Sequence, residues 1–204
     1  MSQERLIIFT RYPEAGKTKT RLIPILGAKG AATLQRDMTE HTLARVKSCD
    51  RPLSVEIHFS GANFQQMQDW LGEQWTYREQ SQGDLGQRMA SAFSTAFADG
   101  MERAVTIGID CPELDANLMN EAFEKLETCD LVLGRAADGG YYLIGLRRDI
   151  PALFEDIDWG TSQVLQQTVA IAEAKNCAIA YLPVLQDIDH PEDLPVWDKI
   201  NACL

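Results

Sequence analysis

The chain has 204 residues, of which 45% are hydrophobic and 24% charged, a composition typical of one large globular domain and too apolar for a disordered chain. Thirty acidic and nineteen basic residues give a net charge of -11, which disfavours nucleic acids and anionic membrane surfaces as partners. A phosphate-bearing ligand must therefore be small and held by a local basic patch.

Short apolar runs alternate along the chain with segments of helical periodicity. Continuous or alternating apolar patterns predict strands over residues 6–9, 53–59, 75–79, 104–109, 131–133, 141–146 and 178–184. Helical spacing predicts helices over about 28–48, 64–71, 85–98, 114–127, 162–175 and from 191 onward. This alternation predicts an α/β fold with a largely parallel sheet, and the absence of repeats and linkers predicts one domain over residues 1–204. In the strand 53–59, alternation predicts one wetter face, on which His58 lies.

The cysteines and the apolar runs indicate in which cellular compartment the protein is expected. The five cysteines are odd in number and widely spaced, so neither a disulfide framework nor a structural zinc site is expected. The first apolar run, Leu6 to Phe9, is too short for the core of a signal peptide, and no stretch approaches the roughly 20 apolar residues of a spanning helix. We therefore expect a cytoplasmic protein.

The loop after the first strand carries a basic cluster. Four basic residues fall within eleven positions and are opposed only by Glu14: Arg11, Lys17, Lys19 and Arg21. The loop leaves the carboxyl end of a strand, where open α/β sheets bind ligands, and Gly16 lets the backbone approach a phosphate. The sequence has neither a complete P-loop motif nor G-x-G-x-x-G. We predict a phosphate site, with a solvated basic loop as the alternative.

Two aspartates are candidate metal ligands. Asp110 follows the strand 104–109, where a carboxylate can hold Mg²⁺ or Mn²⁺ together with substrate phosphates. Asp189 can supply a second carboxylate from a distant segment. Each also fits a helix start, Asp110 before Pro112 and Asp189 before Pro191, so helix capping is the alternative for both.

Three further segments combine glycine with polar or aromatic residues. Residues 138–141, Asp-Gly-Gly-Tyr, are typical of a hairpin turn, or of a substrate loop in which Asp138 is a base or neighbours a metal. Gln82 and Gly83 precede a helix that carries Arg88, which predicts a cradle for an anion or a nucleobase. Trp159 either stacks on a ligand or plugs the fold ahead of a helix.

Together these motifs resemble an uncharacterised family of glycosyltransferase-A-like proteins. Some of its members are named as arsenosugar-biosynthesis glycosyltransferases or radical-SAM-associated transferases. The resemblance rests on six segments that occur in order along nearly the whole chain: residues 13–22, 82–89, 108–112, 138–146, 159–161 and 187–194. One departure is the pair Ala136 and Ala137, where the family pattern has a Pro-Ala-like pair.

The resemblance implies the three-layer, Rossmann-like fold of nucleotide-diphospho-sugar transferases, with a mixed, mostly parallel sheet. It implies that Lys19 and Arg21 hold phosphates and that Asp110 and Asp189 hold the metal, Mg²⁺ or Mn²⁺. With the motifs above, the nucleotide site then comprises Arg11, Gly16, Lys17, Lys19, Arg21, Gln82, Gly83 and Arg88. Asp110 and Asp138 are the expected catalytic residues, and the substrate side comprises Gly139, Gly140, Tyr141 and Trp159.

The reaction expected from the resemblance is glycosyl transfer from a nucleotide-sugar to a small acceptor. Two alternatives stay open. One is a guanylyltransferase-like nucleotidyltransferase that couples a nucleoside triphosphate to a phosphorylated small molecule, an alternative favoured by the absence of an Asp-x-Asp motif at Asp110. The other is a nucleotide- or metabolite-binding protein without turnover, whose ligand binding is insensitive to divalent metal.

Overall fold

The apolar run near the N-terminus forms an inner strand of a seven-stranded mixed sheet in the computed structural model, which describes residues 3–201. The strands are β1 (Glu4–Arg11), β2 (Ser54–Ser60), β3 (Thr76–Glu79), β4 (Arg103–Ile107), β5 (Leu131–Ala136), β6 (Tyr141–Leu146) and β7 (Ile179–Leu185). Their order is β3-β2-β1-β4-β6-β5-β7, in which β6 is antiparallel to both neighbours and the other pairs are parallel. The predicted mixed, mostly parallel sheet is confirmed.

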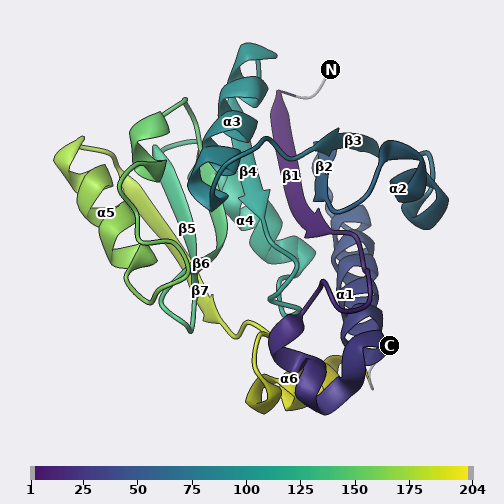
Figure 1. Ribbon diagram of the computed structural model, residues 1–204. Coiled ribbons are helices and arrows are strands. Elements are labelled where there is room, and N and C mark those ends of the chain that lie inside the picture. Colours follow the sequence, from purple (N-terminus) through teal and green to yellow (C-terminus); the bar gives the residue numbers. More distant parts are fainter. Residues whose placement is uncertain (1–2, 202–204) are drawn as a thin grey trace.

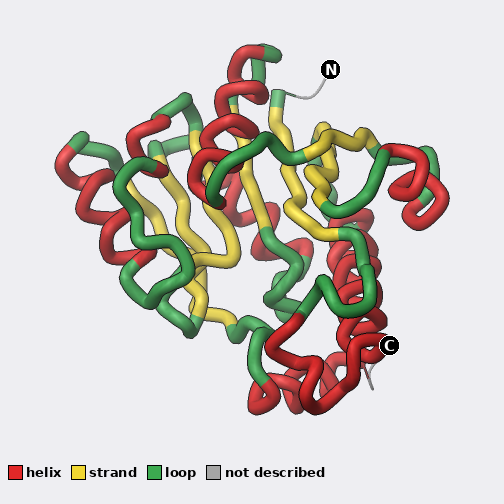
Figure 2. The backbone as a smooth tube through the Cα atoms, viewed as in Figure 1, coloured by secondary structure: helices red, strands yellow, loops and turns green. Residues whose placement is uncertain are grey.

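Helices cover both faces of this sheet (Figure 1, Figure 2). They are α1 (Ile23–Lys47), α2 (Phe64–Leu71), α3 (Leu85–Ala98), α4 (Ala116–Lys125), α5 (Val164–Ala174) and α6 (Leu194–Asn201). Gly27 has a φ of 71° and interrupts α1, so the regular part of that helix begins close to the predicted start. Short 3₁₀ turns at 20–22, 151–154 and 191–193 were not distinguished by the sequence pattern.

The core has two parts because side chains of a strand point alternately to opposite faces. On β1, Leu6 and Ile8 are fully buried against the helices of one face, which include α1 and α4. Ile7 is fully buried on the opposite face, against α3 and the 3₁₀ turn at 151–154. This arrangement is the three-layer architecture that the motifs implied.

The prediction of a wetter face on β2 is wrong. Glu56 and His58 are only 3% and 5% exposed, because an ion cluster covers them. The Glu56 carboxylate accepts from His58 and Arg78 and pairs with Arg5 at 3.2 Å. Burial raises the pKa of Glu56, but these three partners outweigh burial and hold it below its ordinary value. An alternating pattern cannot distinguish a buried ion cluster from a solvated face.

The sheet places two loops side by side at one edge. β1 lies between β2 and β4, and both of these neighbours are parallel to it. The chain moves outward from β1 to β2 and β3 and then returns to β4, so the strand order reverses between β1 and β4. In open α/β sheets this reversal leaves a crevice at the carboxyl ends of the strands, where ligands bind. None of the helices within residues 3–201 combines the length and apolarity needed to cross a membrane.

Candidate active site

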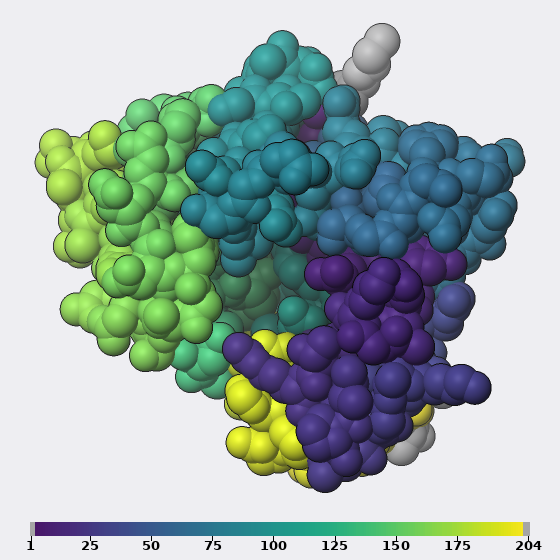
Figure 3. All heavy atoms as spheres, in the orientation of Figure 1, coloured from purple at the N-terminus to yellow at the C-terminus, as the bar shows by residue number. Residues whose placement is uncertain are grey.

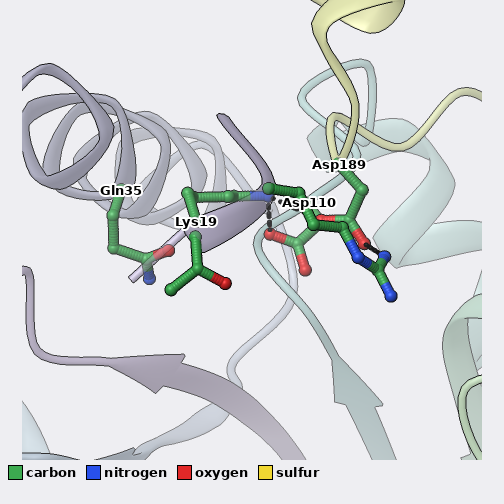
Figure 4. A pocket seen from close by; sticks show the side chains of 6 residues that line it. Lys19, Gln35, Asp110 and Asp189 are labelled. Atoms are coloured by element: carbon green, nitrogen blue, oxygen red, sulfur yellow. Dashed lines mark hydrogen bonds and ion pairs between the residues drawn. The ribbon is translucent and has the colours of Figure 1, made fainter. Parts of the chain in front are cut away.

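Charged side chains from three distant segments meet at this crevice (Figure 4). Lys19 Nζ lies 2.6 Å from Asp110 Oδ1 and 3.2 Å from Asp189 Oδ1, and it also donates to the carbonyl oxygen of Ile188. Arg21 Nη1 lies 3.3 Å from the other carboxylate oxygen of Asp189. The Lys19 side chain is 5% exposed, whereas those of Asp110 and Asp189 are 48% and 35% exposed. The two carboxylates therefore converge on one buried ammonium and stay open to solvent.

Backbone contacts hold this cluster in place. Lys19 adopts a left-handed conformation with φ 45°, which begins the turn that leads into α1. The Ile188 N–H donates to the Asp110 carbonyl at 2.8 Å, and the Ile188 side chain is fully buried. Burial opposes the charged form of Lys19, but Asp110 and Asp189 outweigh it and raise the pKa of Lys19 above its ordinary value. Lys19 thus stays protonated and neutralises part of the charge of two aspartates.

Helix capping does not account for Asp110 or Asp189. The N-terminus of α4 is capped by Asp115, whose carboxylate accepts from the Leu118 N–H at 2.9 Å. The turn before α6 is held by Asp193, which accepts from the N–H groups of His190 and Asp189. The capping interpretation of Asp110 and Asp189 is therefore wrong, and both carboxylates are available to a ligand.

A polar cavity of about 390 Å³ opens beside the cluster; its lining includes Lys19, Thr20, Arg21, Gln35, Asp110 and Asp189. Gln35 is a residue that the sequence analysis missed. It is 5% exposed on the inner side of α1, and its amide donates to the Arg11 carbonyl at 3.1 Å. A glutamine among the apolar positions of an amphipathic helix was the available signal.

A second cavity, of about 220 Å³, adjoins the first and shares Asp110 and Asp189 with it. Figure 3 shows the hollow at this place, between the α3 region, the segment around 140–165, the N-terminal loop and the C-terminal segment. Four further predicted site residues line this cavity: Asp138, Gly140, Tyr141 and Trp159. The fold thus brings the metal and substrate-side predictions together in two adjoining cavities.

The structure shows the local role of each of these two segments, and their ligand-binding roles stay predictions. The Asp138 carboxylate accepts from the Gly140 N–H at 2.8 Å, and Gly139 has a φ of 93°, so residues 136–141 are the predicted hairpin turn. Trp159 packs edge-on against the Tyr141 ring at 6.4 Å between centroids while lining the cavity. The same residues therefore shape the local backbone and face the site.

Asp187 is a further carboxylate that the sequence analysis did not select. It lines the second cavity, and its Oδ1 is buried without a hydrogen-bond partner among the described residues. Burial raises the pKa of Asp187, and the neighbouring charge of Asp138 adds to the shift. Its position two residues before Asp189 in an Asp-Ile-Asp segment was the signal, because alternate residues of an extended chain point the same way.

Seven predicted residues lie outside the described linings of these two cavities: Arg11, Gly16, Lys17, Gln82, Gly83, Arg88 and Gly139. The exposed Lys17 pairs with Glu14 at 2.9 Å. Arg88 donates to the Gly83 carbonyl and lines a separate cavity that includes His58. A Cβ at Gly139 would lie 2.5 Å from the Ser162 carbonyl, so Gly139 serves close packing. The ligand-binding roles of these residues stay predictions.

Asp110 and Asp189 are the residues that fit a divalent cation. Within residues 3–201 no group of three or more His, Cys, Asp or Glu side chains is arranged around a common metal position. Two converging, partly exposed carboxylates are nevertheless the hard oxygen donors that Mg²⁺ and Mn²⁺ take when substrate phosphates and water complete the coordination. An ion there would share these carboxylates with Lys19.

His41 ties α1 to the loop that follows Asp110, and it gives a pH-dependent prediction. Its Nε2 donates to the Pro112 carbonyl at 2.9 Å, and burial lowers the pKa of His41 below 6.5. Between about pH 7.5 and 5.5 the unfolded chain takes up this proton and the folded chain resists it, so stability falls as the pH falls. We expect urea unfolding of the wild type to show this loss of stability as the pH falls through about 6.5, and His41→Gln to show a smaller loss. An equal pH dependence in His41→Gln would contradict this.

The comparisons with known proteins identify the family of the chain and its fold. A family of uncharacterised proteins conserved in bacteria, DUF2064, matches residues 42–161, more than half of the chain. The chain belongs to the DUF2064 family. A search of curated proteins finds no match to the chain. The matched region of this DUF2064 protein contains Asp110, Asp138 and Trp159, whereas Lys19 and Asp189 lie outside it.

Solved structures share the fold of this DUF2064 protein. A candidate nucleotide-diphospho-sugar transferase from Desulfovibrio desulfuricans G20 is 35% identical, with a TM-score of 0.92 over 98% of this chain and 88% of that chain. CMP:2-keto-3-deoxy-manno-octonic acid synthetase complexed with CTP is 10% identical, with a TM-score of 0.64 over 98% and 99%. Rv0371c complexed with manganese, from Mycobacterium tuberculosis H37Rv, is 13% identical, with a TM-score of 0.56 over 96% and 97%. The nucleotide-diphospho-sugar transferase fold is confirmed, and the last two structures bear on the fold alone.

Proposed function

We propose that this protein is a metal-dependent transferase that moves a sugar from a nucleotide-sugar to a small acceptor. The observation that carries the proposal is the pair of adjoining cavities that share Asp110 and Asp189. One cavity carries the basic residues Lys19 and Arg21, and the other carries carboxylates and aromatic rings. The 35% identical relative, named for nucleotide-diphospho-sugar transfer, supports the same assignment.

In this proposal the first cavity holds the diphosphate of the donor. The Arg21 side chain is 60% exposed and can contact a phosphate while it stays close to Asp189. Lys19 holds Asp110 and Asp189 together, so the donor meets a preformed arrangement of charges. A divalent cation bound at these aspartates would stabilise the negative charge that develops on the departing diphosphate.

The second cavity then holds the sugar and the acceptor. The acceptor oxygen forms a bond to the anomeric carbon, while the bond from that carbon to the β-phosphate oxygen breaks. The nucleoside diphosphate leaves with the electron pair of the broken bond. The acceptor proton passes to the Asp138 carboxylate, which lines this cavity and is exposed.

The charge of the second cavity favours glycosyl transfer. Its described lining contains no Lys or Arg, but it contains four aspartates: Asp110, Asp138, Asp187 and Asp189. Carboxylates stabilise the positive charge that develops at an anomeric carbon, and they repel a phosphorylated acceptor such as the nucleotidyl-transfer alternative uses. Nucleotidyl transfer is the second candidate, supported by the likeness in fold to the synthetase complexed with CTP. The arsenosugar or radical-SAM-associated assignment stays a prediction from the motifs.

Product analysis tests the proposal. We expect Mg²⁺ or Mn²⁺ to stimulate release of a nucleoside diphosphate from one of a panel of nucleotide-sugars, and we expect a chelator to abolish the release. We expect Arg21→Ala to raise the KM for the donor about tenfold, because a charge-assisted contact to phosphate is lost. Arg36→Ala is the control, since Arg36 is an exposed residue of α1 that pairs with Glu40.

Three outcomes separate the candidate functions. Release of diphosphate from a nucleotide-sugar supports glycosyl transfer. Release of pyrophosphate from a nucleoside triphosphate, dependent on a phosphorylated acceptor, would replace it with nucleotidyl transfer. Nucleotide binding that ignores divalent metal, with no product from either donor class, would leave a binding protein without turnover.

A further inference from the structure

An inner cavity of about 230 Å³ continues from the acceptor side of the site toward the sheet. It shares Leu85, Gly108, Asp110, Tyr141 and Tyr142 with the second cavity, so the two adjoin. The rest of its lining is mostly apolar and includes Phe9, Met89 and Ile144. The space therefore leads from a carboxylate-lined mouth to an apolar interior between α3 and the sheet.

A buried hydroxyl without a partner lies in the lining of the inner cavity. Thr106 on β4 is 4% exposed, and its Oγ1 makes no hydrogen bond within the described part of the chain. A buried hydroxyl left unpaired destabilises a folded protein, and nearly all such groups in native structures are satisfied. A ligand in the inner cavity that carries its own polar group can supply the missing partner.

Gly108 keeps the junction of the two cavities open. A Cβ built on Gly108 meets no atom within 4 Å, and this glycine does not have the positive φ that would exclude other residues. Neither the backbone nor the packing of the protein therefore requires glycine here. A side chain at this position would project into the free space of the cavities, which is the space a ligand would use.

The charge at the mouth restricts what can enter. Among the residues that line the second and inner cavities none is Lys or Arg, in the part of the chain that the structure describes. Asp187 Oδ1 is buried there and has no described donor, and Asp138 lies beside it. A phosphate or carboxylate group would meet the Asp138 carboxylate and the buried Asp187 oxygen with no cation in the described lining, whereas a hydroxyl or an amine can donate to these oxygens.

We propose that the inner cavity receives the body of the acceptor, and that the acceptor is an alcohol or amine without phosphate or carboxylate groups. Its nucleophilic group lies at Asp138 and Asp187, a ring-sized apolar part fills the inner cavity, and a polar group at the far end pairs with the Thr106 hydroxyl. This inference rests on the proposed function, because it names the substrate class for the second cavity.

Binding of small probes to the protein without nucleotide tests the inference independently of turnover. We expect NMR titration to detect benzyl alcohol at about millimolar dissociation constant, and to detect benzyl phosphate at least about tenfold more weakly. We expect 4-hydroxybenzyl alcohol to bind about threefold more tightly than benzyl alcohol, because its second hydroxyl can reach Thr106. Equal affinity for the alcohol and the phosphate would overturn the inference.

Three variants locate the binding. We expect Gly108→Leu to weaken benzyl alcohol binding about tenfold by filling the junction, and Gly108→Ala to weaken it less. Thr106→Val keeps the shape and should remove only the advantage of the second hydroxyl. Thr42→Val is the control, since Thr42 is a buried threonine of α1 that lines neither cavity.

The outcomes distinguish this inference from the proposed function. If benzyl alcohol binds as expected but no nucleotide-sugar is turned over, the proposed function fails and the cavity assignment stands. If nucleotide-sugars are turned over but Gly108→Leu leaves benzyl alcohol binding unchanged, the acceptor assignment is wrong. If Gly108→Leu does not fold, Gly108→Ala and Thr106→Val still decide the result.

Discussion

Asp110→Asn is expected to reduce transferase turnover at least about 100-fold while the fold is retained. Asp110 is the residue common to all three adjoining cavities, and it faces both Lys19 and the position that fits a divalent cation. An amide has nearly the same shape but no charge, so it neither attracts the cation nor balances Lys19. Initial rates of diphosphate release, with a Mn²⁺ titration of the free protein, measure both losses.

The stability of Asp110→Asn separates a functional role from a structural one. Lys19 loses the partner at 2.6 Å but keeps Asp189 and the Ile188 carbonyl, so we expect a loss of only about 1–2 kcal/mol. Asp69→Asn is the control, because Asp69 is an aspartate of α2 that lines none of these three cavities. A variant with wild-type turnover and metal affinity would remove Asp110 from the active site.

Most of the fold follows from local patterns in the sequence. The continuous apolar runs at 6–9 and 104–109 can be buried on both faces only inside a sheet, and they become β1 and β4. Helical spacing also gave α2 and α3 with their observed bounds, since capping boxes at Asn63 and Asp84 fix where these helices begin. The order of the strands, by contrast, depends on long-range packing that no local pattern contains.

The site was predictable to the extent that it lies at strand ends. Lys19 and Asp110 follow neighbouring parallel strands, so a basic loop and a carboxylate at one edge of the sheet could be expected to meet. Asp189 comes from the C-terminal segment. Its place beside Lys19 and Asp110 depends on the hydrogen bond that the Ile188 N–H donates to the Asp110 carbonyl. The spacing of Asp110 and Asp189 along the sequence does not indicate that they lie close together. The resemblance of the motifs implied it, because it assigned both aspartates to one metal.

The segment 82–89 shows why a glycine-rich motif is ambiguous. Its two glycines predicted a cradle for a ligand, but they have different surroundings. Gly83 is exposed with a φ of 113° and lies just before the N-cap of α3. Gly86 is buried within α3, where Trp159 and the backbone of Phe154 approach it closely. The second glycine therefore serves packing between α3 and a loop that lines the acceptor cavity.

Gly86→Ala is expected to decrease the unfolding free energy by about 1–3 kcal/mol, although alanine is the better helix former. A Cβ at this position would lie 2.6 Å from the Phe154 carbonyl oxygen and 2.5 Å from Trp159 Nε1. The carbonyl belongs to the backbone of a packed turn and cannot rotate away, so the loop that carries Trp159 must move. Urea unfolding measures the first effect, and the KM for the acceptor, expected to rise about tenfold, measures the second.

Gly30→Ala on α1 is the matched control, because its nearest neighbour is a side-chain carbon of Leu26 at 3.1 Å. There the gain in helix propensity and the small repacking offset each other, and we expect a change below about 1 kcal/mol. If Gly86→Ala behaved like Gly30→Ala in both measurements, the approach of Trp159 to α3 would not shape the acceptor cavity. A loss of stability with an unchanged acceptor KM would confine Gly86 to packing and leave the position of Trp159 without a role in binding.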